Sequence, residues 1–469
     1  MSTSKNSSTL SLENFDCIGF DIDHTLCKYK LDNFFPLSYN YSARVLVEKG
    51  YDESLLQPFE INKDFCIKGM VFDSANGDFL KLSDSGVILR ASHGSRMMSD
   101  AEIQDKYGRD RQWQYFSQLE STLEQSDKFS YTENYYDLPC MVLLARLIDL
   151  QENKNGSLIL PKVYQDVIEG YVKGFLYKEK QATILSACEE EPSKYLEQCS
   201  EHLKAWLRSL RDKCQMVFLL SSAHPVFANS AMSYILGEDW RSYFHILLLQ
   251  ARKPGFFSVQ DPSKRPFYTV VDGQQREEVT ELQEGQSYLE GNVFLFNEYI
   301  KKFTGKADPK VLYIGDSIRS DAHPSSKYGN WQNVLVLEEM EVEELIPSGP
   351  CTLDYKEEKQ EEESIETPNI RSGPSEVERE FLLSNRWGSF FGDNLPVDRC
   401  KSSADLNVTE TNPIRTNTLW TRLIRKHSSI AIPKLDYMAD FPMNFKFETF
   451  SSSDWRKGFH PGMPKNVTC

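Results

Sequence analysis

The sequence predicts an α/β fold, namely a doubly wound parallel sheet with a large α+β region inserted after its first strand. Short, nearly continuous apolar runs such as "FDCIGFDID" have the pattern of parallel strands that are covered on both faces. These runs are residues 15–23, 215–222, 244–250, 310–317 and 333–339. Helix-like segments lie between several of them, such as residues 192–213 before the second run. Strands that alternate with helices favour a doubly wound sheet.

The connection between the first two apolar runs is far longer than a crossover between parallel strands needs, so it must hold an inserted region. Within residues 69–94, the turn signals "NG" and "SG" separate alternating runs, which predicts β-hairpins. Residues 137–151 and 160–183 have the periodicity of helices. The insert is therefore predicted to be an α+β cap.

The composition changes after residue 338. Residues 356–366, "KEEKQEEESIE", are polar and acidic with little to bury, which is typical of a flexible linker. Apolar patterning returns at "NRWGSFFGD" and "SSIAIPKL", so a C-terminal segment is expected to pack on the core. The predicted organisation is a core over 12–40 and 210–340, an inserted cap over 41–209, an acidic flexible linker over 341–384 and a C-terminal segment over 385–469.

The charge and the cysteine content exclude several classes of protein. A net charge of −16 would repel a phosphate backbone, which argues against a dedicated nucleic-acid binder. Ten cysteines without a C-x-x-C pair indicate reduced thiols rather than a disulfide framework or a zinc site. The N-terminus lacks an apolar signal region, and stretches such as "MVLLARLIDL" are too short to span a membrane. We therefore expect a cytoplasmic protein with no membrane partner; a homo-oligomer is left open.

Polar side chains follow the predicted strands at the points where those strands end. In an open α/β sheet, ligands bind outside the carboxyl ends of the strands, so residues placed there can converge on one crevice. The residues in question are Asp21 and Asp23, Ser221 and Ser222, Lys253, and Asp316 with Asp321.

These residue types together favour phosphoryl chemistry. Two carboxylates that lie close together cannot both ionise readily without a cation, and Asp21 with Asp316 would supply hard oxygen ligands for Mg²⁺. Asp21 can attack phosphorus as a nucleophile and form an aspartyl-phosphate. Asp23 can protonate the leaving oxygen and later activate water. Ser221, the neighbouring Ser222 and Lys253 could hold the phosphate oxygens.

Each of these residues alone also has an ordinary structural explanation. An aspartate at the end of a strand is often a turn residue or a helix cap. Ser221 could be a satisfied core or turn hydroxyl, and Lys253 a solvated surface charge. "GDSIRSD" could be a strand, a turn and a helix in which Ser317 and Asp321 are capping groups. The joint occurrence favours an active site, because the groups follow successive predicted strands in order.

The same stretches resemble a known superfamily. "DIDHTL", the serine after "VFLL", "RKPGFF" and "GDSIRSD" are similar to the four motifs of the haloacid dehalogenase superfamily of aspartate-nucleophile phosphatases. "FLKLSDSGVILRASHG" and "DLP" more closely resemble the cytosolic purine 5′-nucleotidase family, in its branch of 5′-nucleotidase domain-containing proteins. The resemblance covers about residues 15 to 340 and resumes in "RWGSFF" and "SSIAIP". It implies a Rossmann-like, haloacid dehalogenase-like core with a cap.

The resemblance also implies roles for single residues. Asp21 matches the nucleophile, and Asp23 matches the acid/base, whose backbone carbonyl would also bind Mg²⁺. Asp316 matches a direct metal ligand, and Asp321 a partner of a metal-bound water or of the lysine. The phosphate-binding positions fall on Ser221 and Lys253. His24 and "SSAH" depart from the family pattern, which leaves the base preference and the turnover rate open.

The resulting hypothesis is a Mg²⁺-dependent phosphomonoester hydrolase that acts on nucleoside 5′-monophosphates through an aspartyl-phosphate, with phosphotransfer as a variant. The alternative is a catalytically weak protein that keeps the fold and acts as a binding scaffold. Tyr135 and Tyr136 could stack on a base, but a core role is favoured. Ordinary structural contacts are expected for His93, Arg96, His224, His245 and His323.

Overall fold

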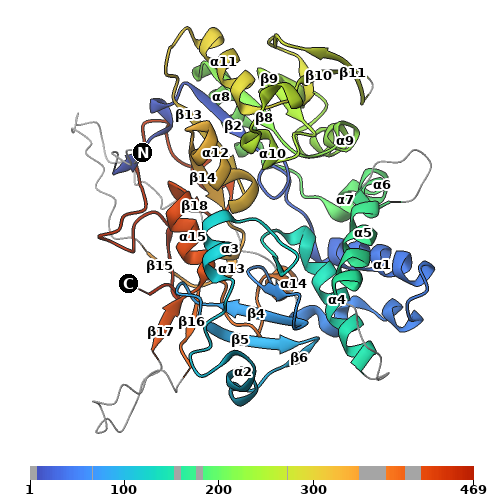
Figure 1. The fold of residues 1–469 in the computed structure, drawn as a ribbon. Helices are drawn as coiled ribbons and strands as arrows, with labels where there is room; N and C mark the ends of the chain where they lie inside the picture. Colours follow the sequence, from blue (N-terminus) through green and yellow to red (C-terminus); the bar gives the residue numbers. More distant parts are fainter. Residues whose placement is uncertain are drawn as a thin grey trace.

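A computed structural model describes residues 8–65, 67–152, 160–175, 183–271, 273–347, 376–396 and 414–468. Its centre is a nine-stranded, mainly parallel sheet in the order β11-β10-β12-β9-β8-β2-β13-β14-β18 (Figure 1). The strands are β2 (Cys17–Phe20), β8 (Met216–Leu220), β9 (Ile246–Leu249), β10 (Phe267–Val271), β11 (Gln274–Val279), β12 (Ser287–Glu290), β13 (Val311–Gly315), β14 (Gln332–Val336) and β18 (Ile430–Ile432). The pairs of β10 with β11 and with β12 are antiparallel, and the other pairs of this sheet are parallel.

The five predicted strands are confirmed as β2, β8, β9, β13 and β14. Because their residues are almost all buried, continuous apolar runs were the right signal for this sheet. β2 is the first of them in the chain, yet it lies between β8 and β13. The chain leaves β2 towards β8 on one side and later returns to β13 on the other. In open α/β sheets, ligands bind at the carboxyl ends of the strands where the strand order reverses in this way.

Helices lie in the chain between and after the strands of the central sheet. They are α8 (Glu201–Lys213), α9 (Pro225–Leu236), α10 (Gly255–Ser258), α11 (Val293–Thr304), α12 (His323–Gly329) and α13 (Glu339–Val342). The predicted helix over 192–213 is two helices, α7 (Pro192–Tyr195) and α8. α8 is amphipathic: Leu203 and Leu207 are buried, and the Ser200 side chain accepts a hydrogen bond from the Leu203 amide and so caps the helix.

A second sheet forms within the long connection between β2 and β8. Its order is β6-β5-β4-β3-β7, and all its pairs are antiparallel. The strands are β3 (Val71–Asp73), β4 (Asp78–Leu82), β5 (Ile88–His93), β6 (Arg96–Met97) and β7 (Phe129–Tyr131). The predicted hairpins are confirmed, since Gly77 and Gly86 take positive φ angles of 71° and 85° in the two turns. Figure 1 shows this sheet below the central one.

The same connection also contains helices. They are α1 (Leu31–Glu48), α2 (Asp100–Tyr107), α3 (Phe116–Thr122), α4 (Leu138–Glu152), α5 (Leu160–Phe175) and α6 (Ile184–Glu190). The helix predicted over 137–151 is confirmed as α4. The one predicted over 160–183 is α5, and residues 176–182 lie outside the described residues. α1 begins at Leu31, before the predicted domain boundary at residue 41.

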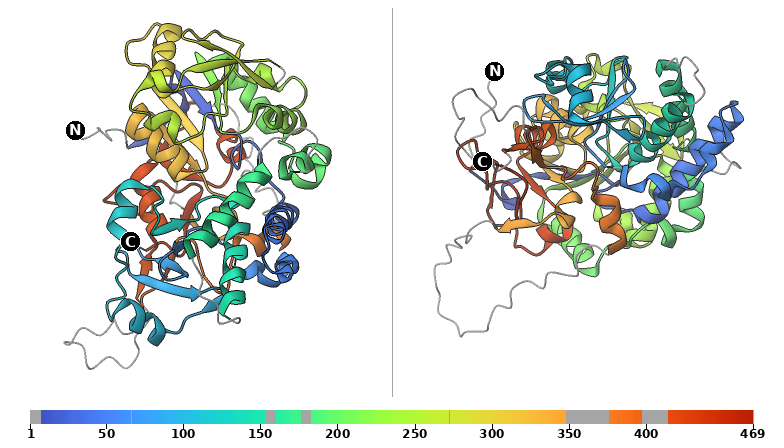
Figure 2. Two further views of the ribbon diagram at one scale, coloured as in Figure 1. Left: turned by 45° about the vertical axis from the view of Figure 1, so that its right-hand side comes forward. Right: turned by 90° about the horizontal axis from the view of Figure 1, so that it is seen from below.

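The C-terminal residues run alongside both sheets, as the turned views show (Figure 2). β18 joins β14 in parallel, and α15 (Leu419–His427) leads into it. Short antiparallel pairs tie further segments together: β1 (Thr9–Leu10) with β19 (Phe447–Glu448), β15 (Leu345–Pro347) with β20 (Gly462–Pro464), and β16 (Gly392–Asn394) with β17 (Arg415–Asn417). The remaining helices are α14 (Glu376–Leu382) and α16 (Leu435–Ala439).

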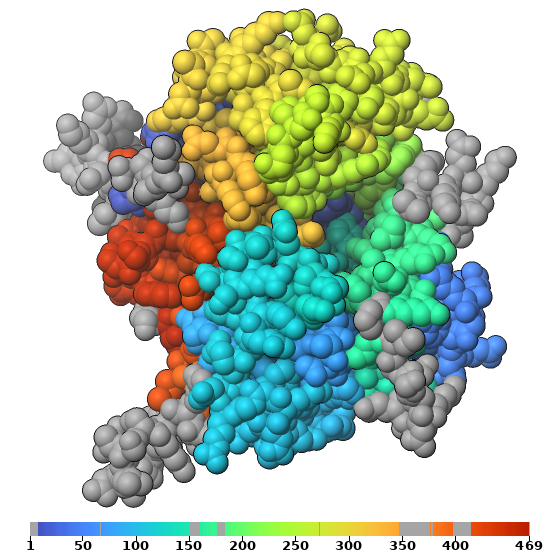
Figure 3. Space-filling view, in the orientation of Figure 1, coloured from blue at the N-terminus to red at the C-terminus, as the bar shows by residue number. Residues whose placement is uncertain are grey.

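Most of the predicted linker over 341–384, namely residues 348–375, lies outside the described residues, and its described ends contain β15 and α14. No helix among the described residues combines the length and the apolar character that a bilayer crossing requires. On the face shown in Figure 3, the upper and lower parts meet around a recess, and dark-blue atoms of the N-terminal part of the chain are visible at its base.

Candidate active site

Asp21 directly follows β2 and is buried, with 6% of its surface exposed. Its backbone amide donates to the Ile314 carbonyl (2.9 Å), which continues the pairing with β13 for one residue beyond the strand. Its Oδ1 accepts a hydrogen bond from the Ile22 amide (2.8 Å), and its Oδ2 lies 2.8 Å from Lys253 Nζ. The carboxylate is therefore held in one orientation at the end of the central strand.

Lys253 is a buried side chain, not the solvated surface charge of the alternative interpretation, since only 2% of the side chain is exposed. Besides Asp21, its Nζ contacts Asp321 Oδ1 (2.5 Å) and donates to the Tyr313 hydroxyl (2.9 Å). Burial alone would lower the pKa of Lys253, but Asp21 and Asp321 outweigh burial and raise the pKa above its ordinary value. Lys253 is therefore a fixed positive charge between two carboxylates.

Asp316 and Asp321 lie on the loop and short helical turn that follow β13. A side chain at Gly315 would collide with Asp321, because a Cβ there would lie 2.5 Å from Asp321 Oδ2. The glycine thus lets Asp321 fold back, where it accepts a hydrogen bond from the Ser317 amide (3.1 Å). Burial, Asp321 and Asp21 raise the pKa of Asp316 well above its ordinary value.

Carboxylate oxygens of Asp21, Asp316 and Asp321 lie within 4.8 Å of one another. All three side chains are buried, and Lys253 contacts two of them, Asp21 and Asp321. Burial is the largest cause of the raised pKa of Asp316, and the neighbouring Asp321 and Asp21 add to it, while Lys68 and Lys253 act in the opposite direction. Buried carboxylate oxygens are the donors that hard divalent cations prefer, so the donor set fits such a cation.

Asp23 lies two residues beyond Asp21 and is partly buried. Its Oδ1 accepts two hydrogen bonds, from the hydroxyls of Tyr29 (2.7 Å) and Tyr136 (2.9 Å). Burial and the charge of Asp21 raise the pKa of Asp23, while the two phenols act in the opposite direction. A carboxyl with a raised pKa, next to a fixed carboxylate, has the properties of a general acid.

Ser221 and Ser222 lie in the loop after β8. The buried Ser221 Oγ accepts from the Ala223 amide (3.2 Å), which is the turn role of the ordinary interpretation. Ser222 is exposed, and its Oγ accepts from the Lys253 amide (2.9 Å). The structure therefore brings both serines to the loop that carries Lys253, and the Ser222 hydroxyl positions that loop.

Several residues of the site come from the region between β2 and β8, and the sequence analysis missed their contacts. Glu133 accepts hydrogen bonds from the Ser317 hydroxyl (2.5 Å) and the Arg319 amide (2.9 Å), so it supports the loop after Asp316. The buried Lys68 Nζ lies 2.9 Å from Glu339 Oε1 and 4.2 Å from the centre of the Tyr135 ring. Burial lowers the pKa of Lys68, but Glu339 and Asp316 outweigh it and raise the pKa.

His24, which departs from the family pattern, belongs to an aromatic cluster. Its backbone has a positive φ of 50°, and its Nδ1 lies 3.0 Å from Glu338 Oε1. The ring packs against Tyr29, Tyr135 and Tyr136, with centroids 4.8 to 5.2 Å apart. Burial raises the pKa of Glu338, but the hydrogen bond with His24 and the nearby positive charges lower it by more. The pKa of Glu338 is therefore below its ordinary value. Tyr135 is thus a core residue, whereas Tyr136 also contacts Asp23.

The other histidines make ordinary structural contacts. His245 Nδ1 accepts from the Val217 amide (2.9 Å), and burial together with Arg211 lowers the pKa of His245 to about 4. His224 accepts from the Val226 amide and so caps α9, and the His323 ring packs against His427. His93 Nδ1 lies 2.6 Å from Asp78, and Arg96 is an exposed residue that pairs with Glu102.

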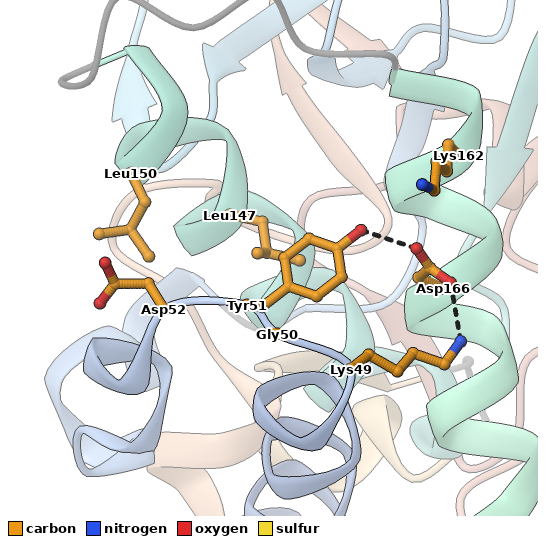
Figure 4. Close-up of a pocket in the computed structure, with 8 residues that line it drawn as sticks. All are labelled: Lys49, Gly50, Tyr51, Asp52, Leu147, Leu150, Lys162 and Asp166. Carbon is orange, nitrogen blue, oxygen red and sulfur yellow. Dashed lines mark hydrogen bonds and ion pairs between the residues drawn. The ribbon is translucent and has the colours of Figure 1, made fainter.

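A cavity of about 300 Å³ lies elsewhere, among α1, α4 and α5 (Figure 4). The Asp166 carboxylate at its edge accepts hydrogen bonds from Lys49 Nζ (2.7 Å) and the Tyr51 hydroxyl (2.7 Å). Leu147 and Leu150 supply the apolar part of the lining. The cavity shares no residue with the carboxylate cluster at the end of the central sheet.

Comparison with known proteins identifies the family of the chain. The sequence model described as the 5′ nucleotidase family matches residues 6–376. The chain therefore belongs to the 5′ nucleotidase family and is an enzyme of that class.

The chain is similar to particular curated members of the family. It is 35% identical to 5′-nucleotidase domain-containing protein 1 of Homo sapiens over 459 residues, which covers 97% of this chain and 96% of that protein. The Bos taurus counterpart is 35% identical over 460 residues, with the same coverage of both chains. 5′-nucleotidase domain-containing protein 2 of Homo sapiens is 25% identical over 342 residues, or 71% of this chain and 62% of that protein. The family resemblance drawn from the motifs is confirmed.

Proposed function

We propose that the protein is a Mg²⁺-dependent phosphomonoester hydrolase that cleaves nucleoside 5′-monophosphates through an aspartyl-phosphate. One observation carries the proposal: Asp21 lies 2.8 Å from Lys253 and within 4.8 Å of the Asp316 and Asp321 oxygens, at the carboxyl end of a parallel sheet. A nucleophile, a phosphate-binding cation and a set of metal ligands are thereby combined at one point.

The metal-binding residues in this proposal are Asp21, Asp316 and the backbone carbonyl of Asp23, with Asp321 in support. Mg²⁺ bound there would neutralise the carboxylates and attract the phosphate. Lys253 holds a non-bridging phosphate oxygen, and Ser221 and Ser222 complete the phosphate-binding loop.

The reaction takes place in two steps. Asp21 Oδ attacks phosphorus, the bond from phosphorus to the 5′ oxygen breaks, and the proton of Asp23 moves to that oxygen. Water then attacks the phosphorus of the aspartyl-phosphate, gives its proton to the Asp23 carboxylate and releases Asp21. Each step leaves Asp23 in the protonation state that the next step needs. Transfer to a nucleoside hydroxyl in place of water would be the phosphotransferase variant.

The proposal extends to the architecture. The central sheet is taken as a doubly wound, haloacid dehalogenase-like core over 12–40 and 210–340, and the region over 41–209 as a cap that excludes water from the intermediate. The C-terminal segment over 385–469 packs on this core, and residues 341–384 form the linker. The small-molecule substrate and buried cysteines that form no disulfide, such as Cys17 and Cys27, support a cytoplasmic location.

The test is phosphate release by the purified protein over a panel of nucleoside monophosphates and sugar phosphates, with Mg²⁺ and with EDTA. We expect release that requires Mg²⁺, that EDTA abolishes and that added Mg²⁺ restores. Titration calorimetry with Mg²⁺ alone provides the control for metal binding. A folded protein that binds Mg²⁺ but releases no phosphate from any substrate would contradict the proposal and favour the binding scaffold.

A further inference from the structure

We propose that Tyr136 is a positioning residue for Asp23: its hydroxyl holds Asp23 Oδ1 so that Oδ2 faces the leaving oxygen of the substrate. The inference deepens the proposed function and rests on it. Its basis is the pair of hydrogen bonds that Tyr29 (2.7 Å) and Tyr136 (2.9 Å) both direct at the same carboxyl oxygen.

Two phenol hydroxyls occupy the lone pairs of Oδ1, because one carboxyl oxygen has about two acceptor positions. The proton that Asp23 transfers is therefore assigned to Oδ2. With both hydrogen bonds in place, rotation of the carboxyl group about its χ2 angle would break both of them. The orientation of the acid is thus fixed before a substrate arrives, as efficient proton transfer requires.

The Tyr136 ring is itself held on several sides. It makes edge contacts with the rings of Tyr29, Phe34 and Phe175, with centroids 5.3 to 5.5 Å apart. The adjacent backbone is also anchored, because the Asn134 side chain accepts from the Asp137 amide (3.2 Å) just before α4 begins. A ring fixed in this way leaves its hydroxyl little freedom, so the hydroxyl can restrain its partner.

Tyr29 and Tyr136 differ in origin. Tyr29 lies six residues after Asp23, within the same loop. Tyr136 lies 113 residues after Asp23, beside the second sheet. The hydrogen bond from Tyr136 therefore forms only when the segment between β7 and α4 lies against the loop after β2. A phenylalanine would satisfy the packing around residue 136 equally well, so the hydroxyl is the atom whose role can be tested.

The chemistry predicts which substrates depend on this hydroxyl. An oxygen leaving group needs the Asp23 proton as its bond to phosphorus breaks, whereas a thiol ionises readily, with an ordinary pKa of about 8.5. When the bridging 5′ oxygen of a nucleoside 5′-monophosphate is replaced by sulfur, the bond from phosphorus to sulfur breaks, and the nucleoside can leave as a thiolate without a proton. A misdirected Asp23 should slow the oxygen ester and spare the sulfur analogue.

The experiment measures kcat/KM for both substrates, because this constant reports the steps up to departure of the leaving group. Tyr136→Phe is expected to lower kcat/KM at least about tenfold for the oxygen ester, part of the 10²- to 10⁴-fold usual for a general acid. It should change the sulfur analogue less than about threefold. Asp23→Asn removes the acid altogether, so it sets the largest loss of kcat/KM to expect for the oxygen ester. It should also spare the sulfur analogue. Tyr131→Phe is the matched control, since the buried Tyr131 hydroxyl donates to the Leu123 carbonyl instead.

Equal losses on both substrates would overturn the inference, because a merely structural role does not distinguish leaving groups. Unchanged kcat/KM on both would overturn it as well. Tyr29→Phe provides a second variant on the same oxygen and should show the same preference even if Tyr136→Phe folds poorly. Failure of the proposed function has a different signature: wild type would then release no phosphate from either substrate.

Discussion

The central sheet and the inserted second sheet contribute to the site in different ways. The loops at the carboxyl ends of the central strands carry the charged groups that would touch a phosphate, such as Asp21, Lys253 and Asp316. The second region carries groups that hold those residues or their loops, as Glu133 holds the loop after Asp316 and Tyr136 holds Asp23. In the proposed mechanism, one region therefore supplies the reacting groups and the other holds them in orientation. Substitutions in the two regions should have effects of different kinds.

The largest expected effect is that of Asp21→Asn, which removes the nucleophile. We expect phosphate release to fall by more than about 10⁴-fold, because an amide cannot form the aspartyl-phosphate. The measurement is phosphate release at saturating substrate and Mg²⁺. Asp308→Asn, at an exposed position on the central part, is the control and should retain full activity. Near-normal phosphate release by Asp21→Asn would contradict the role of Asp21 as nucleophile and show that the central sheet does not supply the attacking group.

Lys253→Met comes next. It should lower kcat about 10²- to 10³-fold, the usual cost of losing one charge-stabilising donor, because no cation would then hold the phosphate oxygen. The measurement is steady-state kinetics on the preferred nucleotide. Lys68→Met is the matched comparison, since both lysine side chains are buried to the same degree, with 2% exposed. Equal losses of kcat in the two variants would contradict the view that the central sheet supplies the reacting groups and the second region only holds them.

Lys68→Met should instead lower the free energy of unfolding, by about 3–5 kcal/mol, because it leaves Glu339 as an unpaired buried charge. Urea denaturation followed by fluorescence measures this quantity. Adding Glu339→Gln to the same chain should recover part of the loss, while kcat changes less than about tenfold in the folded protein. A double variant no more stable than Lys68→Met would show that the pair does not act as a unit.

The smallest effect concerns acid stability in the central part. The pKa of His245 is about 4 in the folded chain, below the ordinary 6.5 of the unfolded chain. Between these values the unfolded chain binds the extra proton, so the free energy of unfolding falls as the pH falls from about 6.5 to about 4, by at most about 3 kcal/mol. His245→Gln should flatten this part of the stability profile, measured by denaturation at several pH values. An unchanged slope would assign the acid sensitivity to other groups.

The central part of the site could be predicted because sequence order carries the necessary information there. A buried parallel strand is a continuous apolar run, and its carboxyl end marks where a ligand-binding residue belongs. That rule located Asp21, Lys253 and Asp316. Applied to the fifth run, the same rule would also have drawn attention to Glu338 and Glu339. They come shortly after the end of β14 and pair with His24 and Lys68.

The contributions of the second region could not be predicted in this way. Glu133 and Tyr136 reach the site through tertiary packing, and nothing in the local pattern indicates which loop they meet. Lys68 left one trace, a single charge within the otherwise apolar stretch "FCIKGMVF", which is a sign of a buried pair. β18 was missed as a strand because it has only three residues and joins β14 from far along the chain.

The pairing of β14 with β18, and of β1 with β19, has a consequence for how the protein is made. β1 leaves the ribosome long before its partner, Phe447–Glu448, is translated, because more than 400 residues separate the two strands. β14 likewise presents an open edge until Ile430–Ile432 have been added. During that interval the nascent chain exposes unpaired strand edges, which are sites of aggregation and of chaperone binding. A premature stop before residue 430 would therefore release a polypeptide with this edge permanently open.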